Sequence, residues 1–195
     1  MLNELLWPFK QLPSKYVALD TETTGLFHQD IAPDVISIGL TEVKDFKITS
    51  SVEYLSKPEK NFSDNAFSIH GMSWEKTQDN PELSDSWDDI CRVIKGELVV
   101  IHNALYDWRV LSLAASNRKL KLPVVEGVFC TQRASQPWAM ANKIKCSERG
   151  ASLAVLADHL DIANLRAENN GFHSARVDSN MLVLVTEELR SKSLP

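Results

Sequence analysis

The most informative part of the chain reads Tyr16-Val17-Ala18-Leu19-Asp20-Thr21-Glu22-Thr23-Thr24-Gly25-Leu26. Its first four residues are apolar or aromatic, which is typical of a buried strand. Asp20 and Glu22 follow, and side chains two positions apart in a strand point to the same face of a sheet. Two carboxylates this close repel each other unless a cation lies between them, and a divalent metal is the usual cation. Taken alone, the pair also fits a polar strand end that runs into a turn at residues 23–25.

The chain has 195 residues, of which 44% are hydrophobic and 24% are charged. These values predict one α/β domain with a sizeable core. We expect this domain to span residues 16–195, after an N-terminal extension over residues 1–15. The net charge of −5 argues against a broad basic surface for non-specific nucleic-acid binding. A nucleic-acid enzyme with local contacts and an acidic, metal-covered centre remains compatible with that charge.

Three cysteines without CxxC spacing indicate neither a disulfide framework nor a zinc site, and they favour a reducing cytoplasm. The first eight residues lack a basic region and are too short to span a membrane, so no membrane partner is expected. This segment either packs on its own domain or serves as a docking peptide.

The apolar patterns predict three strands, followed by alternating helices and strands. Strands are expected at residues 16–20, 35–40, 46–54, 98–101 and 124–130, and helices at 81–95, 104–115, 152–160 and 174–190. A hairpin around Lys44 and Asp45 should join the second and third strands. Residues 132–150 are polar, basic and aromatic by turns and give no clear pattern. The order of elements indicates an α/β domain with a mixed sheet.

Acidic residues occur where predicted strands end and helices begin. Asp107 lies one turn into the helix after the fourth strand, and Asp178 lies near the start of the last helix. Singly, each fits a first-turn aspartate that the helix dipole favours. Together with Asp20 and Glu22, they make four carboxylates that would converge on one strand end, where open α/β sheets collect function. Such a cluster is hard to explain without metal ions.

Two histidines compete for the role of general base. His173 stands five residues before Asp178, a spacing that would separate the two by roughly 140° on one helix. They can share a site if His173 lies on the loop before the helix, and Gly171 favours such a loop. A loop histidine beside bound metal is suited to deprotonating water at neutral pH. His102 ends a buried strand, where orientation of a neighbour or a local hydrogen bond is the expected role.

Three segments carry a resemblance to a known family: Asp20-Thr21-Glu22-Thr23-Thr24-Gly25-Leu26, His102-Asn103-Ala104-Leu105-Tyr106-Asp107 and His173-Ser174-Ala175-Arg176-Val177-Asp178. They resemble, in the same order, the three exonuclease motifs of the DnaQ-like family, and the histidine spacing is similar to that of the DEDDh subgroup, which includes proofreading exonucleases of bacterial replicative polymerases. Ile69-His70-Gly71-Met72 resembles the family's base-contacting turn. The resemblance runs from Tyr16 to roughly Leu189. It implies a ribonuclease H-like fold, with helices flanking a five-stranded mixed sheet that has one antiparallel strand.

The resemblance also implies an activity, namely 3′→5′ hydrolysis of DNA to nucleoside 5′-monophosphates by a two-metal-ion mechanism. The expected ligands of two Mg²⁺ or Mn²⁺ ions are Asp20, Glu22, Asp107 and Asp178. His173 is the expected general base. The expected partner is a single-stranded or frayed 3′ end of DNA, or of RNA, bound by Thr23, Leu26, Ile69, His70 and Asn103.

Alternatives remain at this point. An RNA-trimming exonuclease on the same fold is the nearest one, and the Thr-Glu-Thr-Thr-Gly-Leu form of the first motif favours the DNA enzymes. A non-catalytic nucleic-acid-binding module is the other, although all five chemical positions are filled. Core packing is an alternative role for Leu26 and Ile69. Contact with the phosphate backbone and a solvated basic loop are equal alternatives for Lys143, Lys145 and Arg149.

Three features depart from the family pattern. Tyr106 stands where phenylalanine is common, and residues 132–150 resemble an insertion. No long tail follows the last helix, so association with a polymerase is not supported by the sequence.

Overall fold

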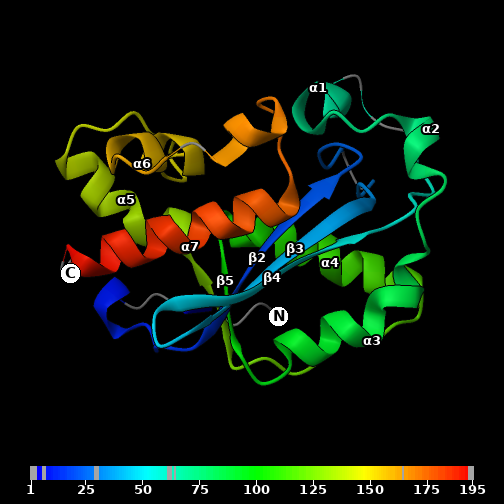
Figure 1. The fold of residues 1–195 in the computed structure, drawn as a ribbon, viewed down its shortest axis with the longest axis horizontal. Coiled ribbons are helices and arrows are strands. Elements are labelled where there is room, and N and C mark those ends of the chain that lie inside the picture. The colour runs from blue at the N-terminus through cyan, green and yellow to red at the C-terminus, as the bar shows by residue number, and fades with distance from the viewer. Residues whose placement is uncertain are drawn as a thin grey trace.

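The structure, a computed structural model, describes residues 4–5, 8–28, 31–60, 63, 65–163 and 165–192. Its centre is a mixed sheet with the strand order β1-β6-β5-β2-β3-β4 (Figure 1). The strands are β1 (Glu4–Leu5), β2 (Tyr16–Thr23), β3 (Val35–Lys44), β4 (Lys47–Leu55), β5 (Leu98–Ile101) and β6 (Gly127–Cys130). β2, β5 and β6 run parallel to one another, whereas β3 is antiparallel to both of its neighbours. These five strands confirm the predicted ribonuclease H-like sheet, and β1 adds a two-residue strand beside β6.

Helices cover both faces of this sheet (Figure 1). They are α1 (Ala66–His70), α2 (Trp74–Thr77), α3 (Leu83–Ile94), α4 (Ala104–Asn117), α5 (Thr131–Ala141), α6 (Leu153–His159) and α7 (Ala175–Ser191), with the 3₁₀ helices η1 (Phe9–Gln11) and η2 (Leu165–Asn169). α7 crosses one face, with α5 and α6 beside it, and α3 and α4 cover the other.

The alternation of side chains along β2 decides on which face the carboxylates lie. Tyr16 and Ala18 pack into the core under α5, α6 and α7, while Val17 and Leu19 pack into the core under α3 and α4. Continuing the same alternation, Asp20 and Glu22 belong to the face that α7 covers.

A close approach between α7 and β3 brings the third motif to the first. Gly39 of β3 pairs with Asp20 of β2. A Cβ atom built at Gly39 would lie 2.0 Å from the carbonyl oxygen of Ala175, the first residue of α7. Only a glycine therefore lets the N-terminal end of α7, which carries Asp178, rest directly on the sheet.

Most of the predicted elements are present. Asp45 and Phe46 join β3 to β4 with positive φ angles of 51° and 61°, as a tight two-residue hairpin turn requires. The fifth predicted strand is shorter than expected, because β6 begins only at Gly127. The segment 132–150, which gave no pattern, contains most of α5 with Pro137 inside it.

The division at residue 15 stays a prediction. Residues 1–3 and 6–7 of the expected extension lie outside the described residues, but Phe9 and Leu12 are buried in the same core cluster as Tyr16. None of the helices in the described part of the chain has the length and apolar composition that crossing a membrane requires.

Candidate active site

The four predicted carboxylates and His173 line one pocket. Its volume is about 350 Å³, and it lies at the carboxyl end of β2, between α4 and the start of α7. Asp20 is partly buried, and Glu22, Asp107 and Asp178 are buried. Acidic side chains from three separate segments of the chain therefore converge on one pocket.

Asp107 reaches the pocket from α4, on the side of the sheet opposite α7. Its Oδ1 accepts hydrogen bonds from the Thr21 hydroxyl at 2.7 Å and from the Thr21 backbone N–H at 3.2 Å. Thr21 points to the α4 face because it stands between Asp20 and Glu22 in the strand. The residue between the two first-motif carboxylates thus fixes the second-motif carboxylate.

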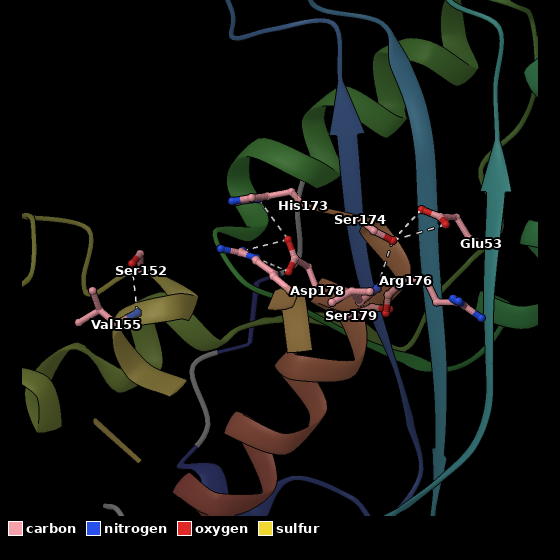
Figure 2. Close-up of polar contacts among 10 residues, drawn as sticks. Glu53, Ser152, Val155, His173, Ser174, Arg176, Asp178 and Ser179 are labelled. Carbon is pink, nitrogen blue, oxygen red and sulfur yellow. Dashed lines mark hydrogen bonds and ion pairs between the residues drawn. The ribbon is translucent and has the colours of Figure 1, made fainter. Parts of the chain in front are cut away.

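Asp178 lies in the first turn of α7, whose start is held by side chains. Ser174 caps the helix by accepting a hydrogen bond from the backbone N–H of Val177, and its hydroxyl donates to Glu53 of β4 at 3.3 Å (Figure 2). The cap fixes the orientation in which Asp178 enters the pocket.

His173 lies on the loop before α7, which is the position that sharing a site with Asp178 requires. Its Nδ1 is 3.2 Å from Oδ2 of Asp178 (Figure 2). The backbone N–H of His173 donates to the carbonyl of Ile69 at 2.9 Å. The turn of the Ile69-His70-Gly71-Met72 segment therefore holds the histidine loop in place.

A cation from an unexpected segment also binds Asp178. Arg166 of η2 donates from Nε to Oδ1 at 2.7 Å and from Nη2 to Oδ2 at 2.9 Å. Charge-assisted bonds in this two-pronged geometry are among the strongest that a carboxylate makes in proteins. No motif in the sequence pointed to Arg166.

The ligand geometry of the pocket suits a metal ion. Glu22, His173 and Asp178 each offer a ligand atom, and these atoms lie within 4.8 Å of one another. Oε1 of Glu22 is buried, and no described residue hydrogen-bonds to it. A buried carboxylate oxygen without a partner is costly, and a hard divalent cation is the partner that it prefers.

Burial raises the pKa of three carboxyl groups in the pocket. Burial, together with the charges of Asp107, Asp178 and Glu22, raises the pKa of Asp20 well above its ordinary value. Burial raises the pKa of Glu22 to about 8 and that of Asp107 to about 7. These groups tend to keep their protons near neutral pH until a cation offsets their charge.

The pKa of Asp178, in contrast, is lowered. Burial also acts to raise its pKa, but the hydrogen bonds from His173 and Arg166 and their charges outweigh burial and lower it. Asp178 is therefore the carboxylate of the cluster that is most readily ionised.

Each ring nitrogen of His102 has a hydrogen-bonding partner within the fold. Its Nδ1 lies 3.0 Å from the hydroxyl of Thr131, and its Nε2 lies 3.1 Å from the carbonyl of Ala151. Burial lowers the pKa of the ring to about 4, so it is neutral at physiological pH. The ring joins the end of β5 to the start of α5 and to the loop before α6.

Thr23, Asn103 and Tyr106, which belong to the first two motifs, also line the pocket. The hydroxyl of Tyr106 donates to the carbonyl of Gly25 at 2.6 Å and lies 2.7 Å from the hydroxyl of Thr23. A phenylalanine at position 106 would lack these contacts. Asn103 has a left-handed backbone, with φ 66° and ψ 48°, a strained conformation that asparagine tolerates better than most residues.

The predicted base-contacting residues differ in exposure. Leu26 lines the pocket and is 78% exposed, and Ile69 is 46% exposed, so neither is a core residue. His70 is only 5% exposed, and its Nδ1 accepts a hydrogen bond from the N–H of Met72. The structure thus gives His70 a different place from the expected one, because a buried ring has little surface for a base.

Of the three basic loop residues, Arg149 lines the pocket, while Lys143 and Lys145 are exposed elsewhere.

Comparison with known proteins identifies the family. A family model described as an exonuclease matches residues 17–186. The epsilon subunit of DNA polymerase III from Escherichia coli is 29% identical over 177 residues, which cover 88% of this chain and 70% of that protein. The corresponding subunit from Haemophilus influenzae is 29% identical over 174 residues, covering 87% of this chain and 65% of its own length.

Solved structures show the same fold at lower identity. Exonuclease X in complex with 5′ overhanging duplex DNA has a TM-score of 0.61 and 22% identity, and the match covers 91% of this chain and 92% of that chain. Exonuclease I of E. coli in a complex with single-stranded DNA has a TM-score of 0.74 and 13% identity, covering 93% of this chain and 41% of that chain. The nuclease domain of 3′hExo, a DEDDh family member bound to rAMP, has a TM-score of 0.66 and 13% identity, covering 93% and 95%. With the family model spanning most of its length, the chain belongs to the exonuclease family, and its fold is similar to that of a DEDDh nuclease domain.

Proposed function

We propose that this exonuclease releases nucleoside 5′-monophosphates from single-stranded or frayed 3′ ends of DNA. The observation that carries the proposal is the convergence of four carboxylates and His173 on one pocket at the end of β2. The relatives are named as subunits of DNA polymerase III, and two of the similar solved structures are described as complexes with DNA. These relatives support DNA as the substrate class.

Two Mg²⁺ or Mn²⁺ ions are the proposed cofactors, and enzymes of this family generally use divalent metal ions. The residues that would hold them are Asp20, Glu22, Asp107 and Asp178. The fit rests on the unpartnered Oε1 of Glu22 and on the raised pKa values of its neighbours, which both call for a cation. Bound ions would supply the positive charge that stabilises the attacking and leaving oxygens of the phosphodiester.

His173 is the proposed general base. When its Nδ1–H donates to Asp178, Nε2 is left as the basic nitrogen that accepts the proton of the attacking water. Asp178 then orients the ring and stabilises the imidazolium that forms. His102 has both ring nitrogens engaged by Thr131 and Ala151, so it serves the structure.

Substrate contacts are proposed for the rim of the pocket. The exposed side chains of Leu26 and Ile69 would pack against the terminal bases, a contact that tolerates any sequence. Thr23 and Asn103 would contact the terminal nucleotide, and Arg149 would meet a phosphate. His70 would act by supporting Ile69 and the His173 loop.

A polymerase is a proposed partner class. The sequence motifs alone did not support one, but the similar epsilon proteins are by name subunits of DNA polymerase III. The support for this proposal is the names of those relatives alone.

The test of substrate class compares matched 3′-labelled DNA and RNA oligomers of one sequence, incubated with Mg²⁺ or with EDTA. We expect DNA to be degraded faster, to mononucleotides, and only with Mg²⁺. Faster loss of RNA would identify an RNA-trimming enzyme instead. Binding of both oligomers without degradation of either would identify a non-catalytic module.

A further inference from the structure

Arg166 holds Asp178 in an ion pair that is unusually well shielded from water. The Arg166 side chain is 14% exposed and that of Asp178 is 3% exposed. Two nitrogens of the guanidinium contact the two carboxylate oxygens at 2.7 and 2.9 Å. Exposed ion pairs contribute little, but a shielded two-pronged pair is hard to break without a replacement for the charge.

This pair uses the atoms that a metal would need. Both oxygens of Asp178 are engaged, since Oδ2 also lies 3.2 Å from Nδ1 of His173. A guanidinium keeps its positive charge under all physiological conditions, and it would repel a divalent cation placed on the same carboxylate. These contacts use three of the roughly four lone-pair sites of the carboxylate, so a metal ion could bind Asp178 through both oxygens only by displacing Arg166.

We propose that Arg166 is the resident counter-ion of Asp178 in the metal-free enzyme and that a metal ion must displace it. Arg166 partly neutralises the carboxylate cluster before metal arrives, and it lowers the apparent metal affinity through competition. The inference rests on the proposed metal site, but it concerns a residue from η2 that lies outside the three motifs.

The charge-matched control is Arg149. This residue also lines the pocket, from the loop after α5, and it is exposed. Arg149→Gln removes one positive charge from the pocket without touching the Arg166–Asp178 pair. A difference between the two variants therefore reports the ion pair and not the net charge.

The experiment is calorimetric titration of Mn²⁺ into metal-free protein, without substrate. We expect Arg166→Gln to bind Mn²⁺ at least tenfold more tightly than wild type, and Arg149→Gln to stay within about twofold of wild type. The Mn²⁺ affinity of Arg166→Lys should lie between those of wild type and Arg166→Gln, because a lysine keeps the positive charge but cannot make the two-pronged contact with the carboxylate. The melting temperature of Arg166→Gln in EDTA should be lower than that of wild type. Saturating Mn²⁺ should raise the melting temperature of Arg166→Gln by more than it raises that of wild type.

The outcomes separate the inference from the function on which it rests. If wild type binds no Mn²⁺, the proposed metal site itself fails. If wild type binds Mn²⁺ and Arg166→Gln binds it equally or more weakly, Arg166 positions Asp178 for the metal and the competition is wrong. Should Arg166→Gln not fold in EDTA, Arg166→Lys decides, because unchanged or weaker affinity in that variant would also overturn the proposal.

Discussion

At the scale of single residues, the carboxylates that suit the site for metal also strain the protein without it. Oε1 of Glu22 is buried without a described partner, and the pKa values of Glu22 and Asp107 are raised to about 8 and about 7. Burial of like charges at one strand end costs folding free energy, which a bound cation would recover.

Replacing Asp20 by Asn should separate these two effects. We expect nearly all nuclease activity to disappear, because one proposed ligand loses its charge. The melting temperature in EDTA should stay the same or rise, since the charge repulsion with Asp107 and Asp178 is relieved. The check is a rate assay with Mg²⁺ beside a thermal melt in EDTA. Wild-type activity in the variant would contradict the metal site.

Replacing His173 by Ala should slow the reaction on the order of a hundredfold or more, the usual effect of losing a general base. Mn²⁺ affinity should remain within a few-fold of wild type. Because His173 also lies near Glu22 and Asp178, a large loss of Mn²⁺ affinity would instead make it a metal ligand.

His102→Ala is the matched control for this variant. It should lower the free energy of unfolding by about 1–3 kcal/mol, because Thr131 and Ala151 lose a buried partner, and it should affect the rate less. If His102→Ala proves the more damaging to turnover at saturating metal, the base has been assigned to the wrong histidine.

At the scale of elements, the site depends on how α7 is seated on the sheet. Gly39 of β3 allows backbone contact with Ala175, and Ser174 caps the helix and reaches Glu53 of β4. These contacts fix the first turn of α7, where Asp178 lies.

Gly39→Ala should therefore disturb fold and site together. The added Cβ would lie 2.0 Å from a backbone oxygen, which cannot move aside as a flexible side chain can. We expect a loss of about 3 kcal/mol or more in the free energy of unfolding, at the upper end for overpacking. Activity should fall as well, because α7 must shift and carry Asp178 away from Asp20.

Urea denaturation measures the stability change, with Lys44→Ala at the exposed end of β3 as the control. Equal stability of the two variants would show that the contact between β3 and α7 is not tight.

Periodicity explains which elements could be predicted. The buried alternation in β2 and the helical spacing of α3 and α7 are long enough to be recognised from sequence. β1 has only two residues, and α5 carries Pro137 with little apolar pattern, so neither gave a signal.

The site was predictable where motifs exist and not elsewhere. The carboxylates and His173 lie in motifs of fixed spacing, and the structure brings them to one pocket. Arg166 reaches Asp178 only because η2 folds back against α7, which no local pattern encodes. The burial of His70 likewise depends on packing, because a histidine in a short turn can point either way.

At the scale of the whole molecule, the carboxylate cluster should give the metal-free protein an unusual pH dependence of stability. Glu22 has a pKa of about 8 in the folded state against an ordinary value of 4.5. Between these values the unfolded chain has lost a proton that the folded protein keeps. The free energy of unfolding should therefore fall as pH rises from about 4.5 to about 8.

Asp20 and Asp107 act in the same direction as Glu22, and Asp178, whose pKa is lowered, adds stability that is lost only in acid. Urea denaturation at pH 5, 6.5 and 8 in EDTA tests this expectation, with Glu22→Gln predicted to reduce the slope. Saturating Mg²⁺ should reduce the slope as well. A stability in EDTA that rises toward pH 8, unchanged by Glu22→Gln, would contradict the protonation states proposed for the cluster.

The activity itself is tested most directly with a 5′-labelled linear single-stranded DNA oligomer and a circular single strand of similar composition, each incubated with Mg²⁺. A 3′→5′ exonuclease shortens the linear strand from its 3′ end, releases nucleoside 5′-monophosphates and leaves the circle intact. Both reactions should stop in EDTA and in the Asp20→Asn variant. Cutting of the circle at a comparable rate, or release of the 5′ label as the first product, would contradict the account.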